Sequence, residues 1–225
     1  VKAWGWNAYG QLGQGNTNNI GDGSNEMGDN LSAINLGTGR TAIAISAGAY
    51  HSVALLDNGT VKAWGNNGYG QLGQGNTTQI GDGSGEMGDN LSAVDLGSGR
   101  TATAISAGAQ HTVVLLDNGT VKAWGSNAYG QLGQGNTTQI GDGSGEMGDN
   151  LSAVDLGSGR TATAIQGGYY TTMVRLDNGT VKAWGRNNKG QLGQGHTNNI
   201  GDGSNEMGDN LSAIDLSSSS DVTLD

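Results

Sequence analysis

The sequence predicts an all-β fold, a partial or small β-propeller of four-stranded antiparallel blades with about four repeats present. The first observation is that the pentapeptide VKAWG at Val61 recurs at Val121 and Val181 and also opens the chain at Val1. This 60-residue period divides one repeat array into four units, the last incomplete: 1–60, 61–120, 121–180 and 181–225. Such units are each too small to bury their own apolar face, so they stack or close into a ring. The second observation is that each unit holds short β-type runs and an Asn-Gly pair but no long helical pattern, which favours propeller blades over a β-solenoid.

The first two strands of a blade are expected before the Asn-Gly pair. Thr101–Ile105 alternates polar and apolar residues, which is typical of a strand with one buried face. His111–Leu116 is almost continuously apolar, as in a strand buried on both faces. A histidine precedes this run at His51 and His111, but Thr171 takes the third equivalent place. We therefore expect these histidines to hydrogen-bond a neighbouring loop rather than to act in catalysis or bind a metal.

Two further strands are expected after the Asn-Gly pair. Val121–Gly125 is the returning strand, and its alternation places Val121 and Ala123 on one face and Trp124 on the other. A Gly-rich loop and a long polar segment follow it. The short apolar run Leu151–Leu156 is then the predicted fourth strand of the blade.

Glycine and asparagine make the turns, because the chain has 44 glycines and no proline. The hairpin at Asn118-Gly119 is expected to place both residues at positive φ, as a two-residue hairpin turn requires. The loop Gly70–Gly75 (GQLGQG) has no Lys-Ser/Thr ending and opens no helix, so it is not a phosphate-binding loop. We interpret it as a series of turns that need positive φ.

Composition excludes several kinds of protein. The formal net charge is −10, and the acidity is built into the repeat, because unit 61–120 alone carries two basic and five acidic residues. This charge argues against binding to the nucleic-acid backbone and favours cations or basic partners. The absence of cysteine excludes disulfides and thiolate metal sites. No run of 18 apolar residues could cross a membrane as a helix.

A motif in each unit resembles the regulator of chromosome condensation repeat. The matching residues are Gly108 and His111, then Asp-Asn-Gly-Thr, then the run Trp124–Gly133 in the pattern WGxNxxGQLG. The resemblance implies a β-propeller, usually of seven blades, in which the sequence repeats are offset from the blades. This chain is too short for seven units of 60 residues, so we expect a fragment of a larger propeller, a four-bladed ring, or a half that closes by oligomerising. It also ends at Ser217–Asp225 where another inner strand is due.

The resemblance also suggests functions. It implies guanine-nucleotide exchange on a small GTPase and chromatin binding for the founding member, and general protein binding for other relatives. No residue of this chain can be assigned to an exchange wedge. The units are nearly identical, so any site would occur three or four times, whereas an enzyme usually has one asymmetric pocket. We therefore predict no catalytic residues and a non-enzymatic protein-binding or structural assembly module, with a protein partner or self-association and no nucleic acid.

An acidic loop in each unit suggests an alternative, a calcium-dependent extracellular module. Its carboxylates are the Ca²⁺ candidates, at Asp22, Glu26, Asp29, Asp82, Glu86, Asp89, Asp142, Glu146, Asp149, Asp202, Glu206 and Asp209. However, Met87 and Ala93 stand where a calcium-loop hairpin would have its glycine and its bidentate glutamate. The other interpretation is a solvated acidic loop in which the recurring methionine, such as Met87, packs the loop against a blade.

The last part of the array departs most from the repeat. Residues that replace commoner ones there include Tyr169, Tyr170, Arg175, Arg186 and Lys189. Tyrosine and arginine together are the composition of an interface hot spot, so these five are the candidate interaction residues. Ordinary divergence near an array end is the alternative, because terminal repeats are usually atypical.

Overall fold

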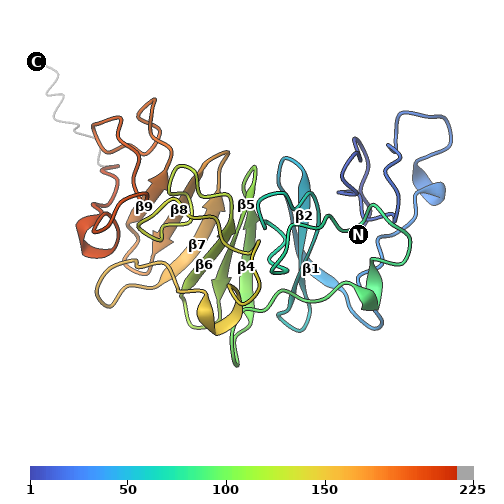
Figure 1. Ribbon diagram of the computed structural model, residues 1–225, viewed down its shortest axis with the longest axis horizontal. Helices are drawn as coiled ribbons and strands as arrows, with labels where there is room; N and C mark the ends of the chain where they lie inside the picture. The colour runs from blue at the N-terminus through green and yellow to red at the C-terminus, as the bar shows by residue number, and fades with distance from the viewer. Residues whose placement is uncertain (217–225) are drawn as a thin grey trace, which may run out of the picture.

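The computed structural model describes residues 1–216, and its strands form three antiparallel sheets of three strands each. The strands are β1 (Ala42–Ala47), β2 (His51–Leu56), β3 (Val61–Gly65), β4 (Ala102–Ala107), β5 (His111–Leu116), β6 (Val121–Gly125), β7 (Ala162–Gly167), β8 (Thr171–Leu176) and β9 (Val181–Gly185). The sheets are β1-β2-β3, β4-β5-β6 and β7-β8-β9. They follow one another across the molecule in chain order, with units 1 and 4 at opposite ends (Figure 1). The prediction of an all-β fold is confirmed.

Each sheet is one blade, and the blades are offset from the sequence units. A sheet takes two strands from the end of one unit and its third strand from the start of the next, as β1 and β2 of unit 1 join β3 of unit 2 through the pairing of β2 with β3. The first strands of the sheets, β1, β4 and β7, lie against one another in series, so they are the inner strands. Because every sheet uses two units, no unit can form its blade alone.

The predicted fourth strand, Leu151–Leu156, is wrong: the structure has no strand there. The open edge of β6 is instead covered by two separate backbone contacts. Gly125 forms an isolated antiparallel bridge with Ile140, and the Val154 N–H donates to the Val121 carbonyl at 2.8 Å. Between these two contacts the acidic loop turns away from the edge of β6. The chain therefore does not run beside β6 far enough to form the repeated hydrogen bonds of a fourth strand.

The hairpin at Asn118-Gly119 also differs from the prediction. Only Gly119 has positive φ, at 79°, and Asn118 does not. The Gly119 N–H donates to the Leu116 carbonyl at 3.0 Å, and the Leu116 N–H donates to the Thr120 carbonyl. These bonds describe a type I turn followed by a left-handed glycine, the longer hairpin connection that also suits twisted strands. The positive φ expected in the Gly-rich loop is confirmed at each glycine of Gly70–Gly75.

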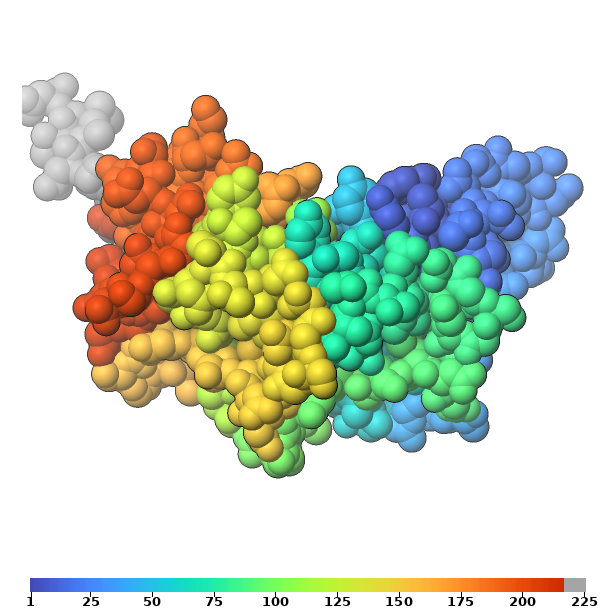
Figure 2. Space-filling model, in the orientation of Figure 1, coloured from blue at the N-terminus to red at the C-terminus, as the bar shows by residue number. Residues whose placement is uncertain are grey.

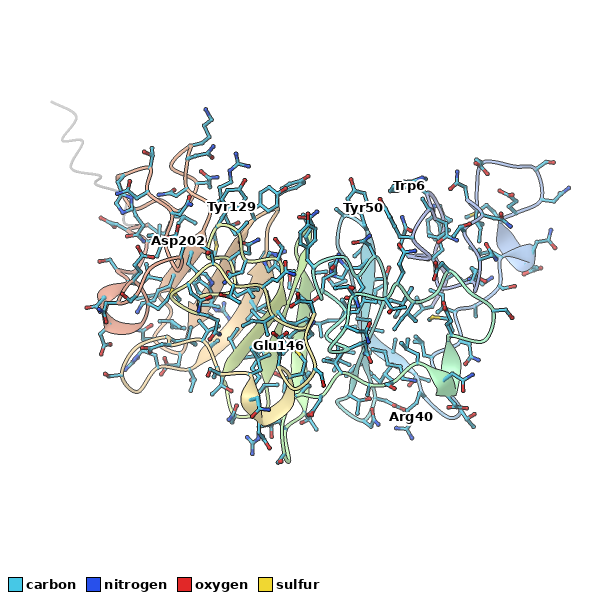
Figure 3. The ribbon with its side chains drawn as sticks, in the orientation of Figure 1. Trp6, Arg40, Tyr50, Tyr129, Glu146 and Asp202 are labelled. Atoms are coloured by element: carbon cyan, nitrogen blue, oxygen red, sulfur yellow. The ribbon has the colours of Figure 1, made fainter. Side chains whose placement is uncertain are left out.

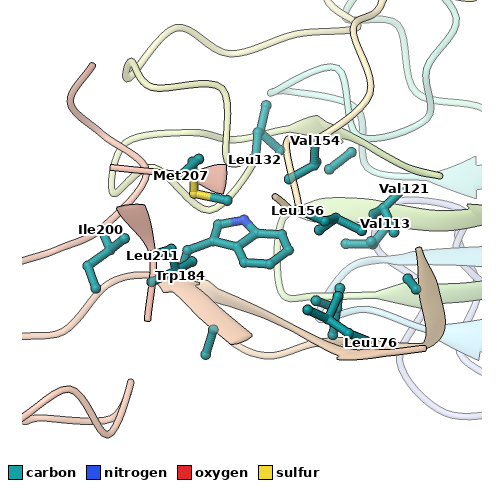
Figure 4. Packing of buried hydrophobic residues seen from close by; sticks show 14 of the residues in the cluster. Val113, Val121, Leu132, Val154, Leu156, Leu176, Trp184, Ile200, Met207 and Leu211 are labelled. Atoms are coloured by element: carbon teal, nitrogen blue, oxygen red, sulfur yellow. The ribbon is translucent and has the colours of Figure 1, made fainter. Parts of the chain in front are cut away.

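The hydrophobic core lies between successive sheets. Val121 lies in the cluster around Trp184 (Figure 4), as does Ala123, whereas Trp124 belongs to the cluster that contains Val53. The two faces predicted for β6 are therefore confirmed. The strand His111–Leu116 is buried at every position, as its continuous apolar run indicated.

The acidic loops contain short helical turns. Four 3-10 helices occur at Gly28–Asn30, Gly88–Asn90, Gly148–Asn150 and Gly208–Asn210. Within residues 1–216, no helix is long and apolar enough to cross a membrane. The inner strand expected near Ser217–Asp225 lies outside the described residues.

Candidate functional site

The contact between successive units, which we call a joint, is built around one backbone carbonyl. The Trp124 indole N–H donates to the Gln71 carbonyl oxygen at 3.1 Å, and the Thr112 hydroxyl donates to the same oxygen at 2.8 Å. Gln71 belongs to the Gly-rich loop of unit 2, so this loop receives the tryptophan of unit 3. The same carbonyl–indole pair joins Gln11 to Trp64 and Gln131 to Trp184.

Glycines allow the two units of a joint to approach closely. A Cβ atom at Gly70 would lie 2.3 Å from the Asp142 backbone nitrogen, and one at Gly73 would lie 2.8 Å from Trp124 Nε1. The latter Cβ would also lie 3.1 Å from the Met147 Cε, so the methionine of the acidic loop packs against the preceding unit. Figure 2 shows the segment around residue 147 packed beside the segment around residue 73.

Polar contacts extend each joint to the acidic loop. Asp149 accepts hydrogen bonds from the Ser98 N–H at 2.8 Å and from the Ser98 hydroxyl at 2.5 Å. These two donors hold the pKa of the Asp149 carboxyl below its usual value. Nearby, the buried Lys122 Nζ donates to the Leu96 and Gly148 carbonyls, and burial lowers its pKa.

The histidines are part of the same contacts, but each one bonds a threonine in a strand of the next blade and not a neighbouring loop as predicted. His51 Nε2 lies 3.1 Å from the Thr112 hydroxyl, and His111 Nε2 lies 3.1 Å from the Thr172 hydroxyl. Because the Thr112 hydroxyl proton goes to the Gln71 carbonyl, His51 must be the donor of its bond. Burial lowers the pKa of His51 to about 3 and that of His111 to about 4, so both rings are neutral at pH 7.

Most carboxylates of the acidic loops accept hydrogen bonds from donors of the chain itself. Glu146 Oε2 accepts from the backbone N–H groups of Gly141 and Gly143, both at 2.8 Å, and Asp142 accepts from the Gln139 amide. The equivalent glutamates in the other units, Glu26, Glu86 and Glu206, accept the same pair of bonds. Within residues 1–216, no three acidic or histidine side chains are grouped to hold a metal ion.

Aromatic side chains gather at one edge of the molecule. Figure 3 shows Trp6, Tyr50 and Tyr129 along this edge and Arg40 at the opposite one. Trp6 meets Tyr50 edge-on with ring centroids 5.5 Å apart, and Tyr9 lies 5.4 Å from Tyr50. We call these three residues the first aromatic cluster. Trp6 is half exposed, so the cluster faces solvent.

A second aromatic cluster consists of Tyr129, Tyr169, Tyr170 and Arg186. The Tyr129 and Tyr170 ring centroids are 5.0 Å apart, and Tyr169 meets Tyr170 edge-on at 4.5 Å. The Arg186 guanidinium lies 4.9 Å from the Tyr129 ring centroid and 5.6 Å from that of Tyr170, at cation–π distances. Burial and the neighbouring Tyr169 raise the pKa of Tyr170. Tyr169 is 66% exposed.

The structure thus unites three of the five candidate interaction residues, Tyr169, Tyr170 and Arg186. Arg175 lies in β8 and donates to the Thr163 hydroxyl at 3.0 Å, outside the cluster. Lys189 is exposed in the loop that follows Arg186 and has no contact with the rings among the described interactions. Tyr129 and the first aromatic cluster were not predicted, although the recurrence of tyrosine at Tyr9, Tyr69 and Tyr129 is a sequence signal that points to them.

Comparison with known families decides what the repeat is. The sequence profile of the regulator of chromosome condensation (RCC1) repeat matches three segments, residues 42–71, 102–131 and 162–191. The chain contains three RCC1 repeats. Each matched segment begins at an inner strand and ends at the glutamine of the Gly-rich loop, so the RCC1 repeat contains the blade and its joint carbonyl. The acidic loops lie outside all three matched segments.

Relatives of known structure share this fold. The chain superposes on human WBSCR16 with a TM-score of 0.66 at 20% identity, over 94% of this chain and 47% of that one. It superposes on yeast RCC1 (Prp20), solved bound to Kap60, with a TM-score of 0.60 at 18% identity, over 88% of this chain and 42% of that one. The predicted β-propeller fold is confirmed, although the blades have three strands rather than four.

A relative found by sequence is much longer than this chain. The E3 ubiquitin-protein ligase HERC2 of Homo sapiens is 29% identical over 86% of this chain, which corresponds to 4% of HERC2. The chain therefore spans less than half the length of each of these three relatives. The predicted resemblance to the RCC1 repeat is confirmed in three segments of the chain.

Proposed function

We propose that this RCC1-repeat chain is a non-enzymatic protein-binding module whose contact surface is the second aromatic cluster. The observation that carries the proposal is the stacking of Tyr129, Tyr169 and Tyr170 with the Arg186 guanidinium at the solvent-facing edge. Tyrosine and arginine dominate interface hot spots because they present large, rigid areas together with polar groups. The rings are already packed against one another, so binding costs them little conformational entropy.

The comparison with the other units supports an interface at the second aromatic cluster. Unit 2 has Ala109 and Gln110 where Tyr169 and Tyr170 stand, and unit 3 has Ser126 where Arg186 stands. The joint residues are the same in these units, so the fold does not require the aromatic residues. The near-identity of the remaining sequence also favours binding over catalysis, because catalysis usually needs one asymmetric site.

The chemistry of the partner follows from charge. The chain carries a formal net charge of −10, which attracts a partner with a basic surface and speeds its association at low salt. Yeast RCC1, which shares the fold, has been solved bound to another protein, Kap60. Protein binding is thus within the capacity of this scaffold.

A capture experiment with a matched variant tests the proposal. The variant replaces three residues by those of the other units, Tyr169→Ala, Tyr170→Gln and Arg186→Ser, so its blade keeps a sequence that already folds elsewhere in the chain. Immobilised wild-type chain and variant are compared for capture of proteins from the source lysate by quantitative mass spectrometry. We expect the variant to capture at least tenfold less of the basic proteins that the wild-type chain captures.

The control is Tyr69→Ala, which removes a 40% exposed tyrosine from the equivalent loop of unit 2, outside both clusters. It should capture the same proteins as the wild-type chain. An identical set of proteins on wild type and triple variant would refute the assigned surface, and capture of no protein at all by the wild-type chain would refute the binding function.

A further inference from the structure

Two of the three joints carry a pair of tyrosines. At the first joint the ring centroids of Tyr9 and Tyr50 are 5.4 Å apart, with an interplanar angle of 58°. At the third joint the ring centroids of Tyr129 and Tyr170 are 5.0 Å apart, with an angle of 48°. Each pair joins the loop of one unit to the β-hairpin turn of the next blade, at positions two repeats apart. The two pairs are therefore copies of one structural feature.

The Tyr129–Tyr170 pair, which we call the occupied pair, already holds a cation of this chain. The Arg186 guanidinium lies 4.9 Å from the centroid of the first ring and 5.6 Å from that of the second. The backbone aims the arginine at the pair, because the Arg186 N–H donates to the Tyr170 carbonyl at 2.9 Å. A cation over the face of an aromatic ring is attracted by the ring quadrupole. A tyrosine pair of this geometry thus accepts one guanidinium on both of its rings.

The Tyr9–Tyr50 pair, which we call the open pair, has Asn66 where the occupied pair has Arg186. The Asn66 N–H donates to the Tyr50 carbonyl at 2.8 Å, so the asparagine starts from the same point as the arginine. Its side chain turns back into its own loop, because Oδ1 accepts from the Gly68 N–H at 3.2 Å and from the Gln71 amide at 2.7 Å. Within residues 1–216, both cation–π contacts belong to Arg186, so no cation of this part of the chain lies on the open pair.

Two neighbours make the open pair attractive to a cation. Trp6 stands where Ser126 stands at the occupied pair, and its ring centroid lies 5.5 Å from those of both tyrosines. It adds a third aromatic ring, of the type that binds cations best. A Cβ atom at Gly10, the residue after Tyr9, would clash with the Asp82 backbone nitrogen, so an acidic residue adjoins the pair. The net charge of −10 attracts cations over a longer range.

We propose that the open pair binds an arginine side chain of a partner protein. The guanidinium would lie on the Tyr9 and Tyr50 rings, in the place that Arg186 takes at the occupied pair. Arginine is favoured over lysine because its planar guanidinium stacks on aromatic faces and is more weakly hydrated than an ammonium group. The open pair shares no residue with the second aromatic cluster, so this proposal can fail or hold independently of the protein-binding surface proposed above.

Titration followed by nuclear magnetic resonance tests the proposal residue by residue. The probe is the peptide acetyl-Gly-Arg-Gly-amide, and acetyl-Gly-Lys-Gly-amide is the comparison peptide of equal charge. In the nitrogen-15-labelled chain, the arginine peptide should shift the backbone amide signals of Tyr9 and Tyr50 most. The lysine peptide should bind the same residues about two- to fivefold more weakly, the ratio expected for a cation–π contact at an exposed site.

Three variants use residues that the chain already carries at equivalent positions. Tyr50→Gln gives the open pair the residue found at the second joint and should abolish the shifts. Asn66→Arg copies the occupied pair, so an arginine of the chain should compete with the peptide and weaken its binding about tenfold. Arg186→Asn copies the open pair, so the peptide should then also shift the signals of Tyr129 and Tyr170.

The matched control is Tyr69→Ala at the second joint, where Gln110 stands in place of the partner tyrosine. This variant should keep the wild-type peptide affinity, and circular dichroism should be the same for all variants. Absence of peptide-induced shifts at Tyr9 and Tyr50 in the wild-type chain would overturn the proposal. So would equal affinity for the two peptides, unchanged shifts in Tyr50→Gln, or wild-type affinity in Asn66→Arg.

Discussion

The Trp124 indole N–H donates to the Gln71 carbonyl oxygen across 3.1 Å, although the two residues are 53 positions apart in the sequence. The tryptophan side chain is fully buried, and the carbonyl accepts a second bond from the Thr112 hydroxyl. One backbone oxygen thus ties the Gly-rich loop of one unit to two strands of the next blade. The same pair recurs at Gln11–Trp64 and Gln131–Trp184, so it is a regular polar link along the array.

Truncation of this tryptophan should destabilise the fold strongly. Trp124→Ala removes a buried indole and leaves a cavity, which typically lowers the free energy of unfolding by about 3–5 kcal/mol. Trp4→Ala is the matched control, because the tryptophan at this equivalent position is 60% exposed and its removal should change the free energy of unfolding by less than about 0.5 kcal/mol. Urea denaturation at low protein concentration measures both values. Equal losses in the two variants would contradict this account of the joint.

Acid should destabilise the chain through its buried histidines. Their pKa values are about 3 for His51 and about 4 for His111 in the folded state, below the ordinary value of 6.5. Between pH 6.5 and these values the unfolded chain binds more protons, so the stability that is present above pH 6.5 is lost as the pH falls. At pH 5, each histidine has lowered the free energy of unfolding by about 2 kcal/mol relative to its value above pH 6.5.

The double variant His51→Thr, His111→Thr tests this dependence, because Thr171 already occupies the third equivalent position. We expect the variant to be less stable at pH 7.5 but to lose much less stability than the wild-type chain between pH 7.5 and pH 5. Denaturation curves at the two pH values give the comparison. Parallel losses in both proteins would show that carboxylates, not the histidines, cause the acid sensitivity.

Calcium should not stabilise the acidic loops. Glu146 Oε2 is held by two backbone N–H groups at 2.8 Å, and Asp149 is held by Ser98 in the neighbouring unit. A cation would have to displace these donors before it could bind. Titration calorimetry with millimolar Ca²⁺ should therefore show no binding heat, and the melting temperature should stay the same. A Ca²⁺-dependent rise in the melting temperature that Glu146→Gln abolishes would establish a calcium site instead.

Much of the blade was predictable from local pattern. The strands at His111–Leu116 and Val121–Gly125, the two faces of the latter and the left-handed glycines of Gly70–Gly75 follow from alternation, apolar content and backbone sterics within a few residues. The strand predicted at Leu151–Leu156 is wrong because these apolar residues pack into the core without pairing as a strand. Val154 and its neighbours pack on β6 through one backbone bond, and a composition pattern cannot tell such a segment from a ladder-forming strand.

The candidate site was predictable only in part, for a similar reason. Tyr169, Tyr170 and Arg186 were recognised as departures from the repeat, but their contact with Tyr129 joins residues of different blades. Arg175 departs from the repeat as clearly and lies elsewhere, on the open face of β8. Divergence from the repeat identifies candidate interaction residues. Which of these residues contact one another depends on how the blades are offset from the sequence units.

By itself, the sequence determined the period, the β-strands of the blade, the RCC1-type motif and the acidity of each unit, because these depend on residues near one another in the chain. Only the tertiary structure decided that Gln71 receives Trp124, that the glutamate of each acidic loop accepts from the backbone of its own loop, and that Tyr129 meets Tyr170. Joint contacts link residues some 40 to 60 positions apart. Their pairing is set by how twisted sheets stack on one another, and that stacking is a property of the assembled array.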